Sequence, residues 1–135
     1  QIRGDTMTYE KLIEKAYEAM AFSYSPYSNF KVGAALLTKS GRVYTGCNIE
    51  IASYGATNCA ERTAIFKAIS EGDHEFVAIA VTSSSRDFTY PCGICRQVIV
   101  EFAKDIDIIV AKEYDYEVYK IDELLPKSFT QIDIK

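Results

Sequence analysis

Hydrophobic and polar positions follow periods that predict helices and strands in the order αββαβαββ. Apolar side chains recur at helical spacing in residues 9–20 and 59–70, and the first of these segments carries charged residues on its opposite face. A third helix is predicted from Pro91 to about residue 103, because proline is favoured where a helix begins. Apolar runs predict strands at residues 30–38, 43–48, 76–82, 106–111 and 116–119.

The connections between these elements indicate how they assemble. Turn-forming residues at 39–42 join the first two strands, which predicts an antiparallel hairpin. The later strands are joined by helices, which indicates parallel crossovers. The expected fold is therefore α/β, with a mixed five-stranded sheet covered by helices.

Length and charge narrow the possible functions. The chain has 135 residues, 48% of them hydrophobic, which is enough to form the core of one domain without a metal or disulfide. It has 15 Lys and Arg against 19 Asp and Glu, a net charge of −4. An acidic chain without a basic stripe argues against nucleic-acid binding, which depends on neutralising phosphates.

The apolar stretches and the N-terminal segment bear on location. No stretch approaches the ~20 apolar residues of a membrane-spanning helix, and residues 1–8 do not resemble a signal peptide, so we expect no membrane partner and a cytoplasmic protein. Residues 1–6 fit no element and are expected to be a natural extension or a cloning remnant. The single domain is expected over residues 7–135.

Three of the four cysteines stand where predicted helices begin. Cys59 opens the second helix, and Cys92 and Cys95 lie in the first turn of the third. A helix N-terminus favours the thiolate, which is the form that binds zinc. Three protein ligands leave a fourth position for water, as in catalytic zinc sites. Cys47 and His74 are interpreted as a small buried residue and an exposed turn residue, not as ligands.

Glu61 decides between the alternatives for this cluster. Cysteines in a Cys-x-x-Cys pair alone would favour a structural zinc or a redox site. If Cys59 stands at the very start of its helix, Glu61 can reach the same ion and act as a general acid and base. Cys-x-Glu followed by Pro-Cys-x-x-Cys is the cysteine form of the zinc deaminase signature.

Motifs spread over most of the chain resemble the small homotetrameric cytidine deaminases. They are SNFKVGAAL at residues 28–36, GCNIE at 46–50, YG at 54–55, CAERTA at 59–64 and PCGICRQ at 91–97. The resemblance covers residues 7–129 and implies the three-layer α/β/α fold of that family. It also implies one Zn²⁺ per chain and hydrolytic deamination of cytidine and 2′-deoxycytidine in pyrimidine salvage.

The resemblance further implies which residues bind the nucleoside. Asn48 and Glu50 match residues that hydrogen-bond the ribose hydroxyls, and Phe30 matches a phenylalanine that packs against the pyrimidine. Ala60 is likewise expected to contact the substrate. Taken singly, Asn48 would be interpreted as a turn residue, Glu50 as a surface carboxylate and Phe30 as a core aromatic.

Two arginines are candidates to offset the negative charge of three thiolates around one Zn²⁺. Arg62 matches an arginine that donates to the cysteine sulfurs in three-cysteine members of the family. Arg96 is the second candidate, with a surface cation as an equally good interpretation.

The resemblance also predicts contacts between subunits, at positions that could otherwise be core or tail packing. Tyr54 and Phe129 match positions that complete a neighbouring active site in the homotetramer. The sequence departs from the family at Ile51, where asparagine is common, and at Ile94, where alanine is usual. Ile51 leaves the preference between cytidine and 2′-deoxycytidine open, and Ile94 is expected to affect packing only.

The sequence disfavours three rival functions. A deaminase of another aminopyrimidine compound is disfavoured by Asn48 and Glu50. A zinc-binding interaction module would need a fourth protein ligand and gives no reason for Glu61. An enzyme that edits DNA or RNA is disfavoured by the acidic charge.

Overall fold

The computed structural model describes residues 7–113 and 115–134. Residues 1–6, for which an extension or remnant was expected, lie outside the described residues. The helices are α1 (Tyr9–Met20), α2 (Ala60–Ser70), α3 (Gly93–Phe102), α4 (Ile121–Leu124), α5 (Gln131–Ile134) and the 3₁₀ helix η1 (Tyr54–Ala56). The strands are β1 (Val32–Thr38), β2 (Val43–Cys47), β3 (Phe76–Ser83), β4 (Asp107–Lys112) and β5 (Asp115–Tyr119).

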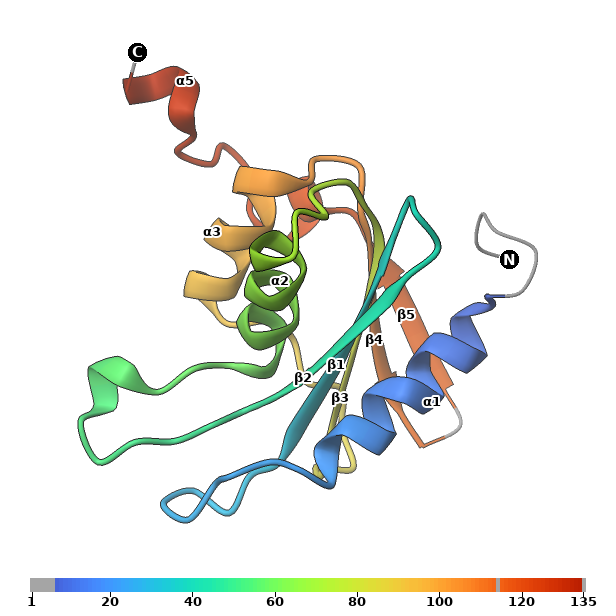
Figure 1. The fold of residues 1–135 in the computed structure, drawn as a ribbon, viewed down its shortest axis with the longest axis vertical. Coiled ribbons are helices and arrows are strands. Elements are labelled where there is room, and N and C mark those ends of the chain that lie inside the picture. The colour runs from blue at the N-terminus through green and yellow to red at the C-terminus, as the bar shows by residue number, and fades with distance from the viewer. Residues whose placement is uncertain (1–6, 114, 135) are drawn as a thin grey trace.

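The strands form one mixed five-stranded sheet in the order β2-β1-β3-β4-β5, as Figure 1 shows. β1 is antiparallel to both β2 and β3, and β5 is antiparallel to β4. Only β3 and β4 are paired in parallel. The expectation of parallel crossovers is confirmed for both helical connections, through α2 and through α3. The connection through α2 carries the chain past β1, so β2 and β3 point the same way without being neighbours.

Helices cover both faces of the sheet, which confirms the three-layer arrangement (Figure 1). α1 packs on one face, where Leu12 and Ala16 contact a buried cluster that includes Leu37 and Ile109. α2 and α3 cover the opposite face, over a larger buried cluster. β1 and β3 are buried on both faces, and this explains their continuous apolar runs.

The helix boundaries follow local signals in the sequence. The Thr8 side chain accepts a hydrogen bond from the Lys11 amide and caps α1. Gly72 has a φ of +83° just after α2, the left-handed conformation that ends many helices. Two short helices near the C-terminus, α4 and α5, were not predicted. Their four residues each are too few to show a helical period.

Two glycines allow the helices to approach the sheet closely. A Cβ atom at Gly33 would lie 2.0 Å from the carbonyl oxygen of Ala16 on α1. A Cβ atom at Gly46 would lie 2.4 Å from the carbonyl oxygen of Ala60 and 2.6 Å from the amide nitrogen of Ala64 on α2. Gly46 on β2 therefore sets the position of the beginning of α2, where Cys59 and Glu61 stand.

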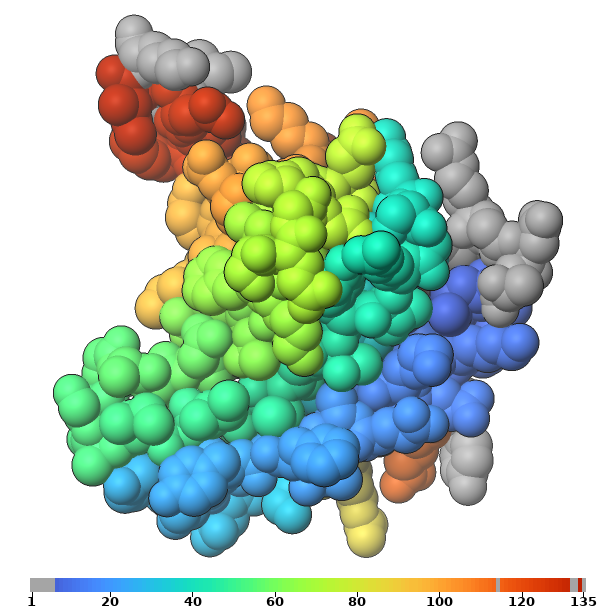
Figure 2. Space-filling view, viewed as in Figure 1, coloured from blue at the N-terminus to red at the C-terminus, as the bar shows by residue number. Residues whose placement is uncertain are grey.

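The connecting segments before β1 and after β2 lie side by side at one end of the sheet (Figures 1 and 2). Tyr24 donates its amide to the Asn48 carbonyl at 3.0 Å, and the Glu50 amide donates to the Tyr24 carbonyl at 2.8 Å. Phe30 was expected inside the first strand but precedes it. β1 begins at Val32, whose amide donates to the side chain of Asn48.

Candidate active site

Three cysteine sulfurs meet where α2 and α3 begin. Cys59 is the N-cap of α2, Cys92 is the N-cap of α3, and Cys95 lies in the first turn of α3. Their sulfur atoms all lie within 4.8 Å of one another, and those of Cys59 and Cys92 are 3.6 Å apart. Zn–S bonds of about 2.3 Å place tetrahedral ligands about 3.8 Å apart, so this donor set fits zinc. The prediction that the three cysteines can hold one ion is confirmed.

The electrostatics of the cluster favour thiolates. Hydrogen bonds from Cys95 and Arg62, which outweigh the effect of burial, lower the pKa of the Cys59 thiol to about 5. The pKa of Cys95 is raised because its thiol donates to Cys59 and is buried. The sulfurs therefore hold fewer protons than separate thiols would at neutral pH, which favours metal binding.

Glu61 is buried beside this cluster, with 4% of its surface exposed. It stands in the first turn of α2, and Cys59 precedes the helix in an extended conformation, as the sequence predicts. Burial, with a smaller effect of the Cys59 charge, raises the pKa of Glu61 to about 7. A carboxyl group with such a pKa can both accept and donate a proton near neutral pH.

The two candidate arginines have different partners. Arg62 donates from Nη2 to the Cys59 sulfur at 3.1 Å, as expected for a cation that offsets the thiolates. Arg96 instead donates from Nε to the Pro91 carbonyl and from Nη1 to the Leu124 carbonyl, each at 2.8 Å. Arg96 therefore ties the start of α3 to the end of α4, and neither of these two bonds reaches a cysteine sulfur.

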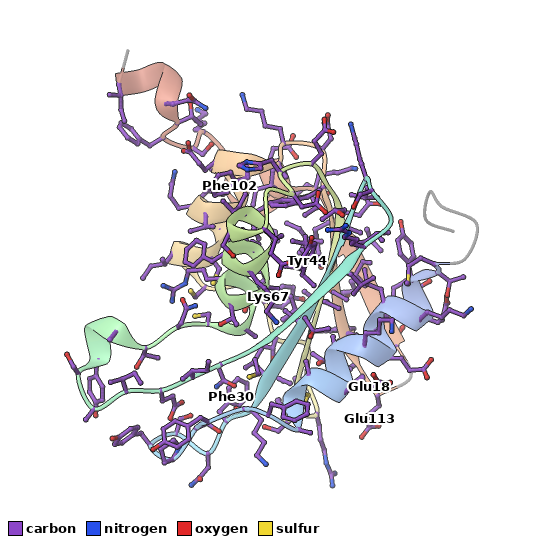
Figure 3. The ribbon with its side chains drawn as sticks, viewed as in Figure 1. Glu18, Phe30, Tyr44, Lys67, Phe102 and Glu113 are labelled. Carbon is purple, nitrogen blue, oxygen red and sulfur yellow. The ribbon has the colours of Figure 1, made fainter. Side chains whose placement is uncertain are left out.

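A cavity of about 250 Å³ opens beside the cysteines. Its walls include all four residues expected to bind substrate, together with Glu61 and two of the three cysteines. They come from the loops at one end of the sheet and from the beginnings of α2 and α3. Those residues are Phe30, Asn48, Glu50, Cys59, Ala60, Glu61 and Cys92. Phe30, labelled in Figure 3, extends from the loop that precedes β1. The structure thus brings the expected substrate-binding residues together with the expected acid–base group and the metal-binding cysteines.

The side-chain amide of Asn48 uses part of its hydrogen-bonding capacity within the protein. Its Oδ1 atom accepts from the Val32 amide at 2.9 Å and from the Ser23 hydroxyl at 2.5 Å. Its Nδ2 atom donates to the Phe30 carbonyl at 2.7 Å. An amide nitrogen carries two hydrogens, so the second is left for a ligand in the cavity.

Glu50 is also held by the loop before β1. Its Oε1 atom accepts from the amides of Tyr27 and Ser28 at 3.0 and 3.1 Å, and its Oε2 atom accepts from the Ser28 hydroxyl. The Ser28 hydroxyl is the main cause of a lowered pKa for Glu50. The carboxylate is therefore ionised at neutral pH and can accept from a further hydroxyl group.

Tyr54 and Phe129 lie away from this chain's own cavity walls. Tyr54 is 76% exposed and borders a neighbouring hollow of about 360 Å³ that shares Glu50 with the cavity. Phe129 is 59% exposed, and its carbonyl accepts from Gln97. A subunit interface would cover such exposed aromatic rings, but that role stays a prediction.

The remaining residues discussed in the sequence analysis lie outside the cavity walls and the sulfur cluster. Ile51 and Ile94 are both exposed, and the expected packing effect of Ile94 stays a prediction. His74 is exposed, as expected. Cys47 is half-buried on β2 and outside the sulfur cluster, and burial raises the pKa of its thiol.

Some cavity residues were missed in the sequence. Thr57 and Asn58 precede Cys59, and Thr89 and Tyr90 precede Pro91, and all four line the cavity. Their position next to the zinc motifs was a usable signal. Ser23, which holds Asn48, gave no such signal because it is remote in sequence.

A three-thiolate zinc site with a buried carboxylate, on a sheet between helices, defines the class of zinc-dependent deaminases. Residues 6–112 match the family model for the cytidine and deoxycytidylate deaminase zinc-binding region. The chain belongs to this family, and the resemblance seen in the sequence is confirmed.

Relatives and solved structures agree with this assignment. A cytidine deaminase of Halalkalibacterium halodurans is 48% identical over 130 residues, which cover 95% of this chain and 98% of that protein. One from Sporosarcina psychrophila is 45% identical over 95% of this chain and 96% of that protein. The crystal structure of a cytidine deaminase from Burkholderia pseudomallei has a TM-score of 0.88 and 47% identity, over 91% of this chain and 100% of that chain.

Membrane insertion through a helix finds no support. Among the described residues, none of the helices combines the length and the apolar character that crossing a bilayer requires.

Proposed function

We propose that this protein catalyses the hydrolytic deamination of cytidine and 2′-deoxycytidine to uridine and 2′-deoxyuridine, with release of ammonia. The observation that carries the proposal is the buried carboxyl group of Glu61 beside three cysteine sulfurs, on a cavity of nucleoside-binding character. The family and the relatives named above support the same reaction.

The proposed mechanism depends on proton transfers by Glu61. Cys59, Cys92 and Cys95 would hold the zinc ion, which would supply a Lewis acid that lowers the pKa of a water. Glu61 accepts a proton from the water that attacks C4 of the cytosine ring. Glu61 passes that proton to ring N3, then takes the proton of the new hydroxyl on C4 and delivers it to the amine nitrogen. A C4=O bond forms as the bond between C4 and that nitrogen breaks and ammonia leaves. Its raised pKa suits both directions of transfer.

The remaining cavity residues bind and orient the nucleoside. The free Nδ2 hydrogen of Asn48 donates to a sugar hydroxyl, and Glu50 accepts from one. The ring of Phe30 packs against the flat base, and the backbone of Ala60 at the start of α2 contacts it. Arg62 donates to the Cys59 thiolate and offsets the negative charge of the site.

The proposal extends to assembly and location. Residues 7–135 form one domain, and four copies form a homotetramer in which Tyr54 and Phe129 reach a neighbouring active site. The exposure of both rings supports this arrangement. The protein works in the cytoplasm, in pyrimidine salvage, with no nucleic-acid or membrane partner. A monomer in sedimentation at micromolar concentration would contradict the tetramer.

The test follows the ultraviolet spectra of cytidine, 2′-deoxycytidine and free cytosine, each incubated with the zinc-loaded protein. We expect both nucleosides to be converted to their uracil forms and free cytosine to be spared, because it lacks the sugar that Asn48 and Glu50 bind. Glu61→Gln, which keeps the size of the side chain, is the matched control and should lose most of its turnover. No conversion of either nucleoside by a protein with one zinc per chain would refute the proposal.

A further inference from the structure

Outside the residues already discussed, the loop that precedes α3 shares a wall of the cavity. We propose that Glu117 is a positioning residue that acts through the hydroxyl of Tyr90 and fixes the cavity wall beside Cys92. The inference rests on the proposed function, because it concerns how the same cavity binds its nucleoside.

The loop between β3 and α3 is anchored near both ends. At its start, the Ser84 amide donates to the Lys31 carbonyl at 2.9 Å, and the Lys31 amide donates to the Ser84 hydroxyl at 3.0 Å. Near its end, the hydroxyls of Thr89 and Ser83 are 2.6 Å apart. Thr89 and Tyr90 then line the cavity. The shape of this wall therefore depends on how Tyr90 is held.

Tyr90 is held from the far edge of the sheet. Its hydroxyl donates to Oε1 of Glu117 on β5 at 3.0 Å, and the hydroxyl of Tyr119 donates to the same oxygen at 2.6 Å. The two tyrosine rings meet edge to face, with centroids 5.9 Å apart. One carboxylate oxygen thus joins a cavity residue to a strand that pairs with β4 opposite Val110.

Packing alone does not hold the Tyr90 ring, since 41% of the residue is exposed. A half-exposed tyrosine can change rotamer unless its hydroxyl has a fixed partner. The paired backbone of β5 supplies a rigid base for that partner. A second contact, Lys112 over the Phe88 ring at 4.7 Å, holds the same loop but involves no cavity residue.

Loss of the Glu117 acceptor should affect substrate binding more than chemistry. A Tyr90 ring without its partner samples several positions, and the nucleoside must then order it on binding, which raises KM. Cys92 keeps its place, because the adjacent Pro91 carbonyl is held by Arg96. Glu61 lies on α2 and is not touched, so kcat should be retained.

The experiment compares four single variants of the zinc-loaded full chain, and the double variant Glu117→Val with Tyr90→Phe. Glu117→Val removes the acceptor and suits a strand, whereas Glu117→Gln keeps an acceptor oxygen and should rescue. Tyr90→Phe removes the donor. Tyr119→Phe is the matched control, because it removes the other hydrogen bond to the same oxygen and leaves Tyr90 bound. Steady-state kinetics with cytidine and hydrogen exchange of residues 84–91 are measured for each.

We expect Glu117→Val and Tyr90→Phe to raise KM about threefold to tenfold with kcat unchanged, and to speed hydrogen exchange in the loop. The double variant should be no worse than either single one. Glu117→Gln and Tyr119→Phe should behave like the unmodified protein. Unchanged KM or unchanged exchange in Glu117→Val would overturn the proposal, and so would a parallel loss of kcat and zinc.

Failure of the proposed function would be recognised separately. In that case the unmodified protein would not deaminate cytidine, and the inference about nucleoside binding would fall with it. A protein that turns over cytidine but shows no separation of KM from kcat in Glu117→Val would leave the proposed function standing and overturn the inference alone.

Discussion

Gly46 lies outside the proposed active site, but its replacement by alanine should displace residues of that site. The new Cβ atom would lie 2.4 Å from the Ala60 carbonyl oxygen and 2.6 Å from the Ala64 amide nitrogen. Both are backbone atoms of α2, so no side chain can rotate away. Ordinary contacts begin near 3.4 Å, so the start of α2 must retreat by about 1 Å.

The expected magnitudes follow from this displacement. Overpacking of this kind costs about 1–3 kcal/mol of the free energy of unfolding. Because Glu61 and Cys59 move with the start of α2, kcat/KM should fall about 100-fold, the usual effect of a 1 Å misplacement. Thermal unfolding measures the first quantity, and turnover of cytidine with zinc content measured in parallel gives the second.

Gly33→Ala is the matched control. Its Cβ atom would lie 2.0 Å from the Ala16 carbonyl oxygen, so α1 is pushed from the opposite face of the sheet. α1 carries no proposed site residue, and we expect a loss of stability with little loss of kcat/KM in the folded protein. A folded, zinc-loaded Gly46→Ala protein as active as Gly33→Ala would refute the reasoning.

Three further predictions concern charges. Glu61→Gln should keep the fold and one zinc per chain, yet lower kcat about 10²–10⁴-fold, and near-native turnover would exclude its acid–base role. Arg62→Gln should shift the acidic limb of the pH–rate profile upward, because loss of a cation beside the thiolates disfavours further deprotonation of the site; an unmoved limb would contradict this. Burial alone would raise the pKa of Asp73, but hydrogen bonds from three hydroxyls of the β1–β2 hairpin lower it below its ordinary value. Its ionised form therefore stabilises the fold above that ordinary pKa, and the contribution is lost as pH falls through the lowered value. Asp73→Ala should cost about 1 kcal/mol at neutral pH and little in strong acid, and melting temperatures that differ equally at both would count against it.

Much of the fold could be predicted because its signals are local. Helical spacing of apolar residues located α1 and α2 to within a residue, and apolar runs located every strand to within two. Strand pairing was harder to predict from the sequence, because it joins segments that are far apart in the chain. The helical crossovers indicated the direction of the strands, but the insertion of β1 between β2 and β3, antiparallel to both, could not be predicted from them.

The candidate site likewise combines features that the sequence predicts with features that only the fold decides. The spacing of Cys59, Cys92 and Cys95 was sufficient to predict one metal site, because each cysteine stands at a helix start. Arg62 and Arg96 looked alike as neighbours of these cysteines. Only the fold showed that the carbonyls of Pro91 and Leu124 occupy Arg96 while Arg62 is free to reach a sulfur.

By itself the sequence determined the five strands, the three longer helices, the ligand types and the proposed acid–base group, because periodicity, helix capping and thiolate chemistry act over a few residues. Tertiary structure decided which groups hold those residues in place. The Ser23 hydroxyl on Asn48 and the Glu117 carboxylate behind Tyr90 are 25 and 27 residues distant in sequence from their partners. Such contacts depend on strand order and on the close approach of helix to sheet at Gly46, and no local pattern encodes either.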